Sequence, residues 1–224
     1  MIVGDGWTYL HLPKSGGSFW MRYFETSGLG RRQERQHDGV RHIPTEQRDT
    51  RLVWGTIRHP LRWLESYYRH FYRSGVPVDG LTRFTDGTPA PISFRRWVYL
   101  STHPLEAHDI LKPIPIVPQH EGHTFATWAA EGGGFASWFY RYTFTVRGEL
   151  RAHALVDATD DSRPGVVSLF RRHGLPLDHR MLWEWDGRTN GSPKSIACEW
   201  DQEMIGWVRS ADGEHWRTYW PDSW

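Results

Sequence analysis

The stretch "YLHLPKSGGSFWMRYF", residues 9–24, contains the turn on which the predicted fold depends. Residues 7–13 are mostly apolar and end at Pro13, which cannot donate to a sheet ladder, so they are typical of a short buried strand. Residues 18–27 favour a helix that ends before Gly28. The stretch therefore predicts a strand, a short loop of Lys, Ser and two Gly, and then a helix.

The rest of the chain continues this alternation. Further strands are predicted over 51–57, 154–159 and 181–185, and helices over 60–75, 92–102, 162–174 (capped by Ser162) and 198–213, while 135–144 suit either type. Loops are predicted over 29–39, 76–91 and 187–195, and residues 215–224 are expected to be irregular. Alternating strands and helices indicate an α/β fold, a parallel sheet flanked by helices, in a single domain of residues 1–224.

Composition excludes several classes of protein. The 224 residues contain 27 Lys and Arg against 26 Asp and Glu, so the chain lacks the excess positive charge that a nucleic-acid or membrane-surface binder needs. Cys198 is the single cysteine, which excludes an internal disulfide and a cysteine-rich metal site. The first residues lack a basic segment followed by a long apolar one, so no signal peptide is expected, and no apolar run approaches the length of a membrane helix, about 20 residues. We expect a soluble cytoplasmic protein without nucleic-acid or membrane partners; no oligomeric state is predicted.

The loop after the first strand has the residues of an anion site. Gly16 and Gly17 let the backbone approach a ligand closely, and the helix that starts near Ser18 adds free amides and the positive end of its dipole. Lys14 adds a full charge, and Ser15 adds a hydroxyl. An ordinary tight turn with a surface lysine is the alternative. In the phosphate loop of ATP and GTP enzymes the lysine follows the glycines, whereas here it precedes them.

A second junction, "IRHPLRWLESYY" at residues 57–68, offers another pair of anion ligands. Arg58 stands at the end of the predicted strand, and Ser66 lies two turns into the following helix. An arginine fork and a hydroxyl can share one phosphate, although a solvated arginine and a surface serine would also explain them. Because parallel strands end at the same edge of a sheet, we expect this junction and the first to lie on one edge.

Together the two junctions resemble the motifs of sulfotransferases that use 3′-phosphoadenosine 5′-phosphosulfate (PAPS). The first motif of that family, within residues 9–24 here, has the form Pro-Lys-[Ser/Thr]-Gly-[Gly/Thr]-[Ser/Thr] and holds the 5′-phosphosulfate. The second, within 57–70, is Arg-x-Pro, five residues, then Ser, and holds the 3′-phosphate. "RTNGSPKS" and "EWDQEMIGWV", with the key positions in 188–200, look like the closing segment of Golgi-type and related bacterial carbohydrate sulfotransferases. The resemblance covers little of residues 76–150.

The resemblance implies a P-loop-type sulfotransferase fold and an enzyme that moves a sulfuryl group from PAPS to a hydroxyl or amine, leaving 3′,5′-adenosine bisphosphate (PAP). The residues it assigns to the donor are Pro13, Lys14, Ser15, Gly16, Gly17, Ser18 and Phe19 for the phosphosulfate and adenine, Arg58 and Ser66 for the 3′-phosphate, and Arg188, Asn190, Ser192 and Lys194 over the nucleotide. Lys14 would be catalytic because it stabilises the departing phosphate. The acceptor, a carbohydrate or small molecule, would bind residues 76–150.

Transfer to a hydroxyl also needs a base, and "RQHDGVRHIP", residues 35–44, offers candidates. In related carbohydrate sulfotransferases a histidine in this interval is the base. His37 matches that position best because Asp38 and Gly39 follow it; His42 is the second candidate, and Asp38 is the carboxylate alternative. The spacing of these residues is not that of a standard zinc site, and sulfuryl transfer needs no metal, so none is expected.

Two other classes of function stay open at this point. The first is a P-loop small-molecule kinase that uses ATP and magnesium, with Asp157, Asp160 and Asp161 as possible metal ligands. The second is a non-catalytic protein that keeps the anion loop to bind a nucleotide and uses some of its 14 tryptophans to bind a glycan.

Overall fold

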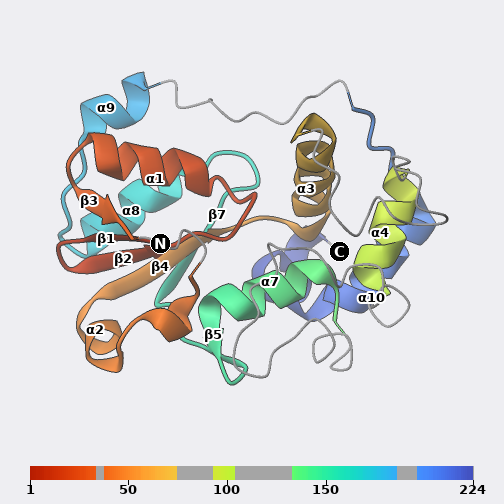
Figure 1. Cartoon of the computed structure of the whole chain (residues 1–224), viewed down its shortest axis with the longest axis horizontal. Helices are drawn as coiled ribbons and strands as arrows, with labels where there is room; N and C mark the ends of the chain where they lie inside the picture. The colour runs from red at the N-terminus through yellow and green to blue at the C-terminus, as the bar shows by residue number, and fades with distance from the viewer. Residues whose placement is uncertain (34–37, 75–92, 104–132, 186–195, 224) are drawn as a thin grey trace. The chain divides into compact units, whose positions relative to one another are not determined.

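The computed structural model describes residues 1–33, 38–74, 93–103, 133–185 and 196–223 (Figure 1). The contacts divide the chain into two compact units, each described here by itself. The first comprises Met1–His59 and Phe139–Gly191, and the second Pro60–Trp138 and Ser192–Trp224. The expectation of a single domain stays a prediction.

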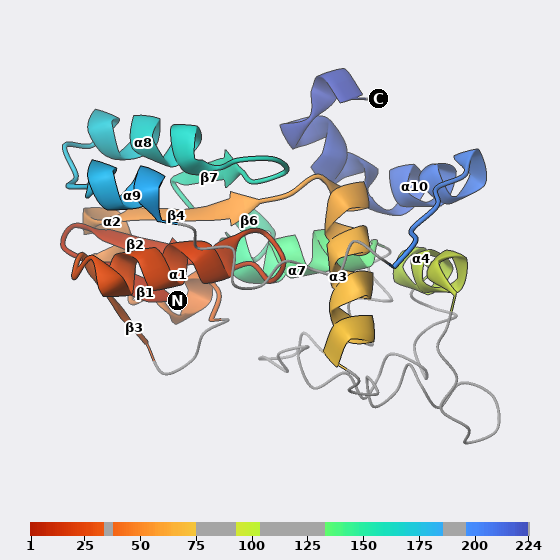
Figure 2. The ribbon, with the colours of Figure 1, turned by 90° about the horizontal axis from the view of Figure 1, so that it is seen from above.

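The first unit is built on a five-stranded mixed sheet. In spatial order its strands are β3 (Gly30–Arg32), β1 (Ile2–Gly4), β2 (Trp7–Leu10), β4 (Leu52–Ile57) and β7 (Ala154–Asp157). β2, β4 and β7 run parallel, with Tyr9 opposite Trp54 and Gly55 opposite Leu155. Figure 2 shows β4 between β2 and β7. The predicted α/β class and the parallel strands are therefore confirmed.

The expectation of an entirely parallel sheet was wrong at one side. β1 pairs antiparallel with both β2 and β3. β1 has only three residues before a tight turn in which Gly6 takes φ 72°, and β3 lies in the charged segment predicted to be a loop. Such short strands carry too few apolar residues for a period of two to be recognised. Backbone pairing with a neighbouring strand, which is a tertiary contact, produces them.

Helices α1 (Gly17–Thr26) and α8 (Arg163–Arg172) pack on one face of this sheet (Figure 1). Their apolar residues share a core with the buried side chains of the strands. Trp54 of β4 lies at the centre, with ring centroids 4.6 Å from Tyr9, 6.0 Å from Trp20 and 5.4 Å from Phe170. Because successive strand residues face opposite sides, Gly55 faces the other layer, where a Cβ atom would lie 2.3 Å from the ring of Phe144.

That other layer contains short elements and the end of α7 (Phe135–Phe144). The segment 135–144, which suited either type, is therefore a helix. It leads into the hairpin of β5 (Thr145–Val146) and β6 (Glu149–Leu150). The 3₁₀ turn η1 (Val40–His42) and α2 (Thr45–Thr50), neither of them predicted, precede β4.

Several sequence predictions need correction. Residues 181–185 were predicted to be a strand but belong largely to α9 (His179–Glu184), which Asp178 caps by accepting the Met181 amide at 2.9 Å. Ser162 does not cap α8 with its side chain; its hydroxyl accepts the indole N–H of Trp20 at 2.9 Å. The short, mostly apolar run of residues 181–185 resembles a buried strand only while the preceding cap is ignored.

The second unit contains α3 (Pro60–Ser74), α4 (Phe94–Thr102) and α10 (Gln202–Tyr219), which confirms the predicted helices. α10 starts later than predicted because Asp201 caps it, accepting the Met204 amide at 2.8 Å. It also continues through the first half of the segment expected to be irregular, and η2 (Pro221–Ser223) follows it. None of the helices in the described ranges has the length and apolar character needed to cross a membrane. The predicted loop 76–91 lies outside the described residues.

Candidate functional site

The loop that joins β2 to α1, called here the glycine loop (residues 13–18), has an unusual backbone. Lys14 takes φ 63° and Gly16 φ 75°, so two of its residues are left-handed. This conformation is ordinary for glycine but strained for lysine. Turns of this kind direct successive amide groups to one side, and α1 begins immediately afterwards at Gly17. The loop therefore presents amides and the positive end of a ten-residue helix to the same region.

Ser15 adds a buried hydroxyl to the glycine loop. Its side chain is fully buried, and its Oγ has no hydrogen-bond partner among the residues that the structure describes. An unpartnered buried hydroxyl costs about 1–3 kcal/mol, so such groups are normally satisfied. An anion bound in the loop is a partner of the right chemistry, because it would accept the hydroxyl proton.

The His11 side chain packs against the first residue of α1, Gly17. It is only 3% exposed, and a Cβ atom at Gly17 would lie 1.8 Å from its Cδ2 and 2.3 Å from its Nε2. Glycine is therefore the residue that fits this position while the imidazole is present. His11 was not predicted as a site residue, although a polar residue within the apolar stretch 7–13 is a signal that the sequence contains.

Arg58 lies against the glycine loop. It follows the last residue of β4, and its Nη1 donates a hydrogen bond to the carbonyl oxygen of Lys14 at 3.3 Å. The expected proximity of the two junctions is thus confirmed for Lys14 and Arg58. Ser66 lies half-buried in the second turn of α3 and belongs to the second unit, so its role beside Arg58 stays a prediction.

The segment after β7 completes this edge of the sheet. The amide of Ala158 donates to the carbonyl of Ile57 at 2.8 Å, and the amide of His59 donates to Oγ1 of Thr159 at 3.0 Å. Oδ1 of Asp157 accepts from the hydroxyl and the amide of Thr159, at 2.6 and 2.7 Å. The ends of β4 and β7 are therefore tied together on both sides of Arg58. The sequence did not indicate Thr159 because this link joins residues 100 positions apart.

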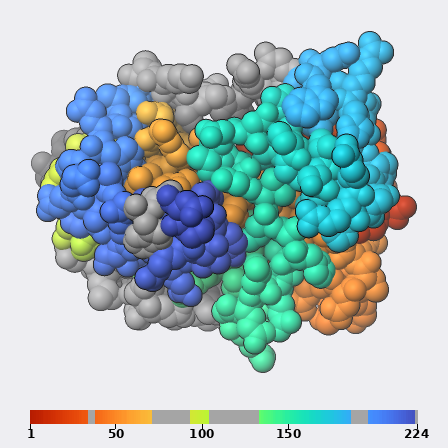
Figure 3. All heavy atoms as spheres, turned by 180° about the vertical axis from the view of Figure 1, so that it is seen from behind, coloured from red at the N-terminus to blue at the C-terminus, as the bar shows by residue number. Residues whose placement is uncertain are grey.

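A cavity of about 650 Å³ adjoins the glycine loop. Gly16 and Phe19 line it from the start of α1, and further lining residues include Asp160, Arg163, Trp183 and Trp185. The Phe19 and Trp185 rings are 5.5 Å apart between centroids. Figure 3 shows the outer surface of α8 and α9, the elements that contribute Arg163 and Trp183. Aromatic rings that line a cavity beside the glycine loop suit a nucleotide base.

Arg163 forms one side of this cavity together with its partners. Its guanidinium carbon lies 4.9 Å from the centre of the Trp183 ring, and it donates two hydrogen bonds to Asp161, at 3.0 and 2.9 Å. The hydrogen bond from Arg163 holds the pKa of Asp161 below its usual value. Neither Arg163 nor Trp183 was predicted as a site residue: Arg163 was placed in the helix predicted over 162–174, and Trp183 in the strand predicted over 181–185.

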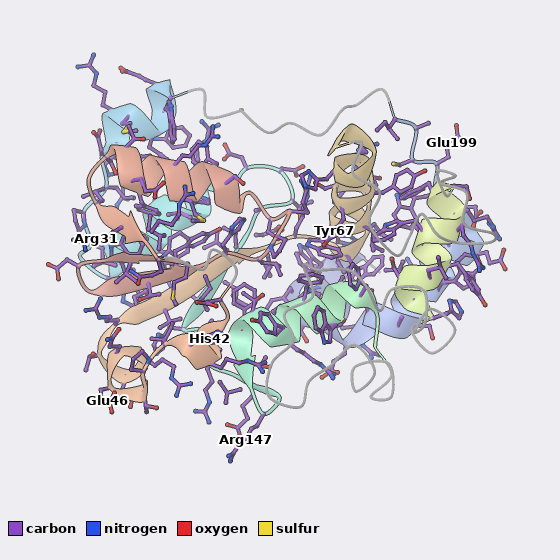
Figure 4. All side chains as sticks on the ribbon, in the orientation of Figure 1. Arg31, His42, Glu46, Tyr67, Arg147 and Glu199 are labelled. Carbon is purple, nitrogen blue, oxygen red and sulfur yellow. The ribbon has the colours of Figure 1, made fainter. Side chains whose placement is uncertain are left out.

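The candidate bases are only partly described. His37 lies outside the described residues. Asp38 and His42 come together: Nδ1 of His42 is 3.7 Å from Oδ1 of Asp38 and 3.2 Å from the carbonyl oxygen of Gly39. Figure 4 shows His42 beside the end of α7, where its ring centroid is 6.4 Å from that of Tyr142. These acceptors favour a proton on Nδ1, which leaves Nε2 as the basic nitrogen.

The remaining predicted site residues cannot be compared with the structure. Arg188, Asn190, Ser192 and Lys194 lie outside the described residues, as do most of residues 76–150. The possible magnesium ligands are described, and two are already engaged: Asp157 accepts from Thr159, and Asp161 from Arg163. Within the described part of the chain, no three His, Cys, Asp or Glu side chains are grouped closely enough to hold a metal ion.

Comparison of the chain with protein-family models, with curated proteins and with solved structures gave no match. Function is therefore inferred from the residues and their geometry.

Proposed function

We propose that the protein is a sulfotransferase that transfers the sulfuryl group of PAPS to a hydroxyl or amine of a carbohydrate or small-molecule acceptor. The observation that carries this proposal is the glycine loop. Its left-handed Lys14 and Gly16, the start of α1 and the unpartnered hydroxyl of Ser15 form an anion site, and Arg58 is bonded to its backbone. The fold would accordingly be of the P-loop sulfotransferase type.

Each part of the donor has a proposed partner in the first unit. The amides of Gly16, Gly17 and Ser18 hold the 5′-phosphosulfate, and Arg58 holds the 3′-phosphate. The adenine occupies the aromatic cavity beside Phe19, and the ring of Trp185 close to Phe19 supports this placement. The Arg58 guanidinium, bonded to the carbonyl of Lys14, supports a donor that carries a 3′-phosphate over a nucleotide that carries only a 5′-phosphate chain.

The proposed reaction is a direct in-line displacement. The acceptor oxygen attacks sulfur, the bond from sulfur to the 5′-phosphate oxygen breaks, and the proton of the acceptor passes to the base. Lys14 stabilises the negative charge that develops on the departing phosphate. His37 is the proposed base; His42, with Nδ1 facing Asp38 and Gly39, is the alternative that has a describable geometry.

The kinase alternative has less support. It needs carboxylates free to bind magnesium, whereas Asp157 and Asp161 are engaged by Thr159 and Arg163. The lysine also precedes the glycines rather than following them. A non-catalytic nucleotide-binding or glycan-binding protein would use the same loop and cavity, and only turnover separates it from the enzyme.

Thermal unfolding with different nucleotides tests the proposal. We expect PAP with EDTA to stabilise the protein, by about 2.7 kcal/mol at one hundred times its dissociation constant. 5′-AMP should stabilise it much less at the same concentration. Stabilisation by ATP only when magnesium is present would favour the kinase, and no shift with any nucleotide would contradict the proposal. Incubation with labelled PAPS and an acceptor panel then separates the enzyme from a binding protein.

A further inference from the structure

The peptide that carries Arg58 is held from the β7 side by a chain of hydrogen bonds. The amide of His59, the residue after Arg58, donates to Oγ1 of Thr159 at 3.0 Å. The same hydroxyl donates its proton to Oδ1 of Asp157 at 2.6 Å. Because Pro60 has no N–H, the His59 amide is the last backbone donor before α3 begins.

Arg58 is held on three sides as a result. Ile57 precedes Arg58, and its carbonyl oxygen accepts a hydrogen bond from the Ala158 amide at 2.8 Å. His59 follows Arg58, and its amide donates to the hydroxyl of Thr159. The Arg58 guanidinium itself donates to the carbonyl oxygen of Lys14 at 3.3 Å. An arginine fork recognises a phosphate only in a fixed orientation, so the position of this peptide decides where the fork points.

We propose that Thr159 and Asp157 are positioning residues that set Arg58 for recognition of the 3′-phosphate. This inference rests on the proposed function. A hydroxyl at position 159 can accept from His59 and donate to Asp157 at once, and the Asp157 carboxylate fixes which way that hydroxyl points. Asp157 thereby acts on Arg58 through Thr159.

Removal of the hydroxyl has a defined consequence. A valine at position 159 has nearly the same shape but no acceptor, so the hydrogen bond from the His59 amide is lost and the Arg58 peptide loses its restraint on that side. Serine keeps the hydroxyl and should keep the link. The proposed 5′-phosphate site depends on the glycine loop. The hydrogen bonds of Thr159 go to His59 and Asp157, which are not part of that loop.

The test compares PAP with 5′-AMP by calorimetry in Thr159→Val, Thr159→Ser and Arg58→Ala. We expect Thr159→Val to weaken PAP binding about tenfold, the scale of one hydrogen bond, and to change AMP binding less than twofold. Thr159→Ser should bind both nucleotides like the wild type. In the Arg58→Ala background, Thr159→Val should cause no further loss of PAP affinity, because the group that it positions is already absent.

A second pair of variants protects the test against misfolding. Asp157→Asn keeps an oxygen that accepts from Thr159, so it should retain the preference for PAP, whereas Asp157→Ala should lose it. Unchanged PAP affinity in Thr159→Val, or equal losses for PAP and AMP, would overturn the inference. If the wild type itself does not prefer PAP to AMP, or if Arg58→Ala leaves that preference intact, then the proposed function fails, and the inference fails with it.

Discussion

Lys14 combines a strained backbone with the charge on which the proposed chemistry depends. Its φ of 63° lies in the left-handed region, and Ala would be strained there as well. Lys14→Ala should therefore fold with nearly unchanged stability, while conversion of PAPS to PAP falls at least about a hundredfold, corresponding to about 3 kcal/mol of lost stabilisation of the leaving phosphate. Circular dichroism and a turnover assay check the two parts, and near-normal turnover in the folded variant would contradict the assignment.

Lys14→Gly provides the matched control. Glycine adopts positive φ without strain. The free energy of unfolding of this variant should therefore equal that of the wild type or exceed it by up to about 1 kcal/mol. Its turnover should nevertheless be as low as that of Lys14→Ala. A stable but inactive Lys14→Gly protein would indicate that turnover is lost with the charge of Lys14 and not through backbone strain, whereas near-normal turnover would contradict the role of that charge.

Sequence alone could indicate some residues of this site and not others. Lys14, Gly16 and Arg58 follow from local signals, a loop between a strand and a helix and an arginine at a strand end. Ser15 was predicted as a donor, but its burial depends on packing. Thr159 acquires its role only from a contact with His59, which no local pattern contains.

At the level of the element, the start of α1 depends on one close contact. A Cβ atom at Gly17 would overlap the His11 ring, so Gly17→Ala should displace the first turn of the helix and weaken PAP binding at least about tenfold. In the double variant His11→Ala, Gly17→Ala the space is restored, and part of the affinity should return. Calorimetry with PAP measures both.

The control for that pair is the same substitution elsewhere. Gly206 lies within α10, and a Cβ atom there would meet nothing within 4 Å. Gly206→Ala should therefore stabilise the protein by about 0.5–1 kcal/mol and leave PAP binding unchanged. If Gly17→Ala behaved in the same way, the close contact with His11 would not govern the loop.

Elements with caps and long apolar stripes were predictable, whereas elements defined by their partners were not. α3 was recognised from its apolar stripe, and β4 from its run of apolar residues. β1 and β3 were missed because they form through backbone pairing with neighbouring strands, and three residues are too few to show a strand pattern in the sequence. α9 was misassigned because "MLWEW" was read without Asp178, whose side chain starts the helix.

For the whole molecule, the order of the elements was enough to predict the α/β class and the parallel strands. The same order determines where the candidate site lies. Parallel neighbours end on the same edge, which brings the segments after β2, β4 and β7 together. With a net charge of +1, no general attraction for anions operates, so any donor affinity must come from the local groups at this edge. The mixed character of the sheet depends on the short antiparallel strands, which add nothing to that edge.

The core that supports this edge can be separated from the site itself. Trp54 is fully buried among aromatic rings, and Trp54→Ala should lower the free energy of unfolding by about 3–5 kcal/mol, while Trp54→Phe should cost less. Ligand stabilisation depends on affinity and not on the starting stability. Urea unfolding with and without PAP should therefore show the same increment in Trp54→Phe as in the wild type, but a smaller one in Thr159→Val. A loss of the increment in Trp54→Phe would mean that core packing, rather than the hydrogen bonds at the edge, sets the nucleotide site.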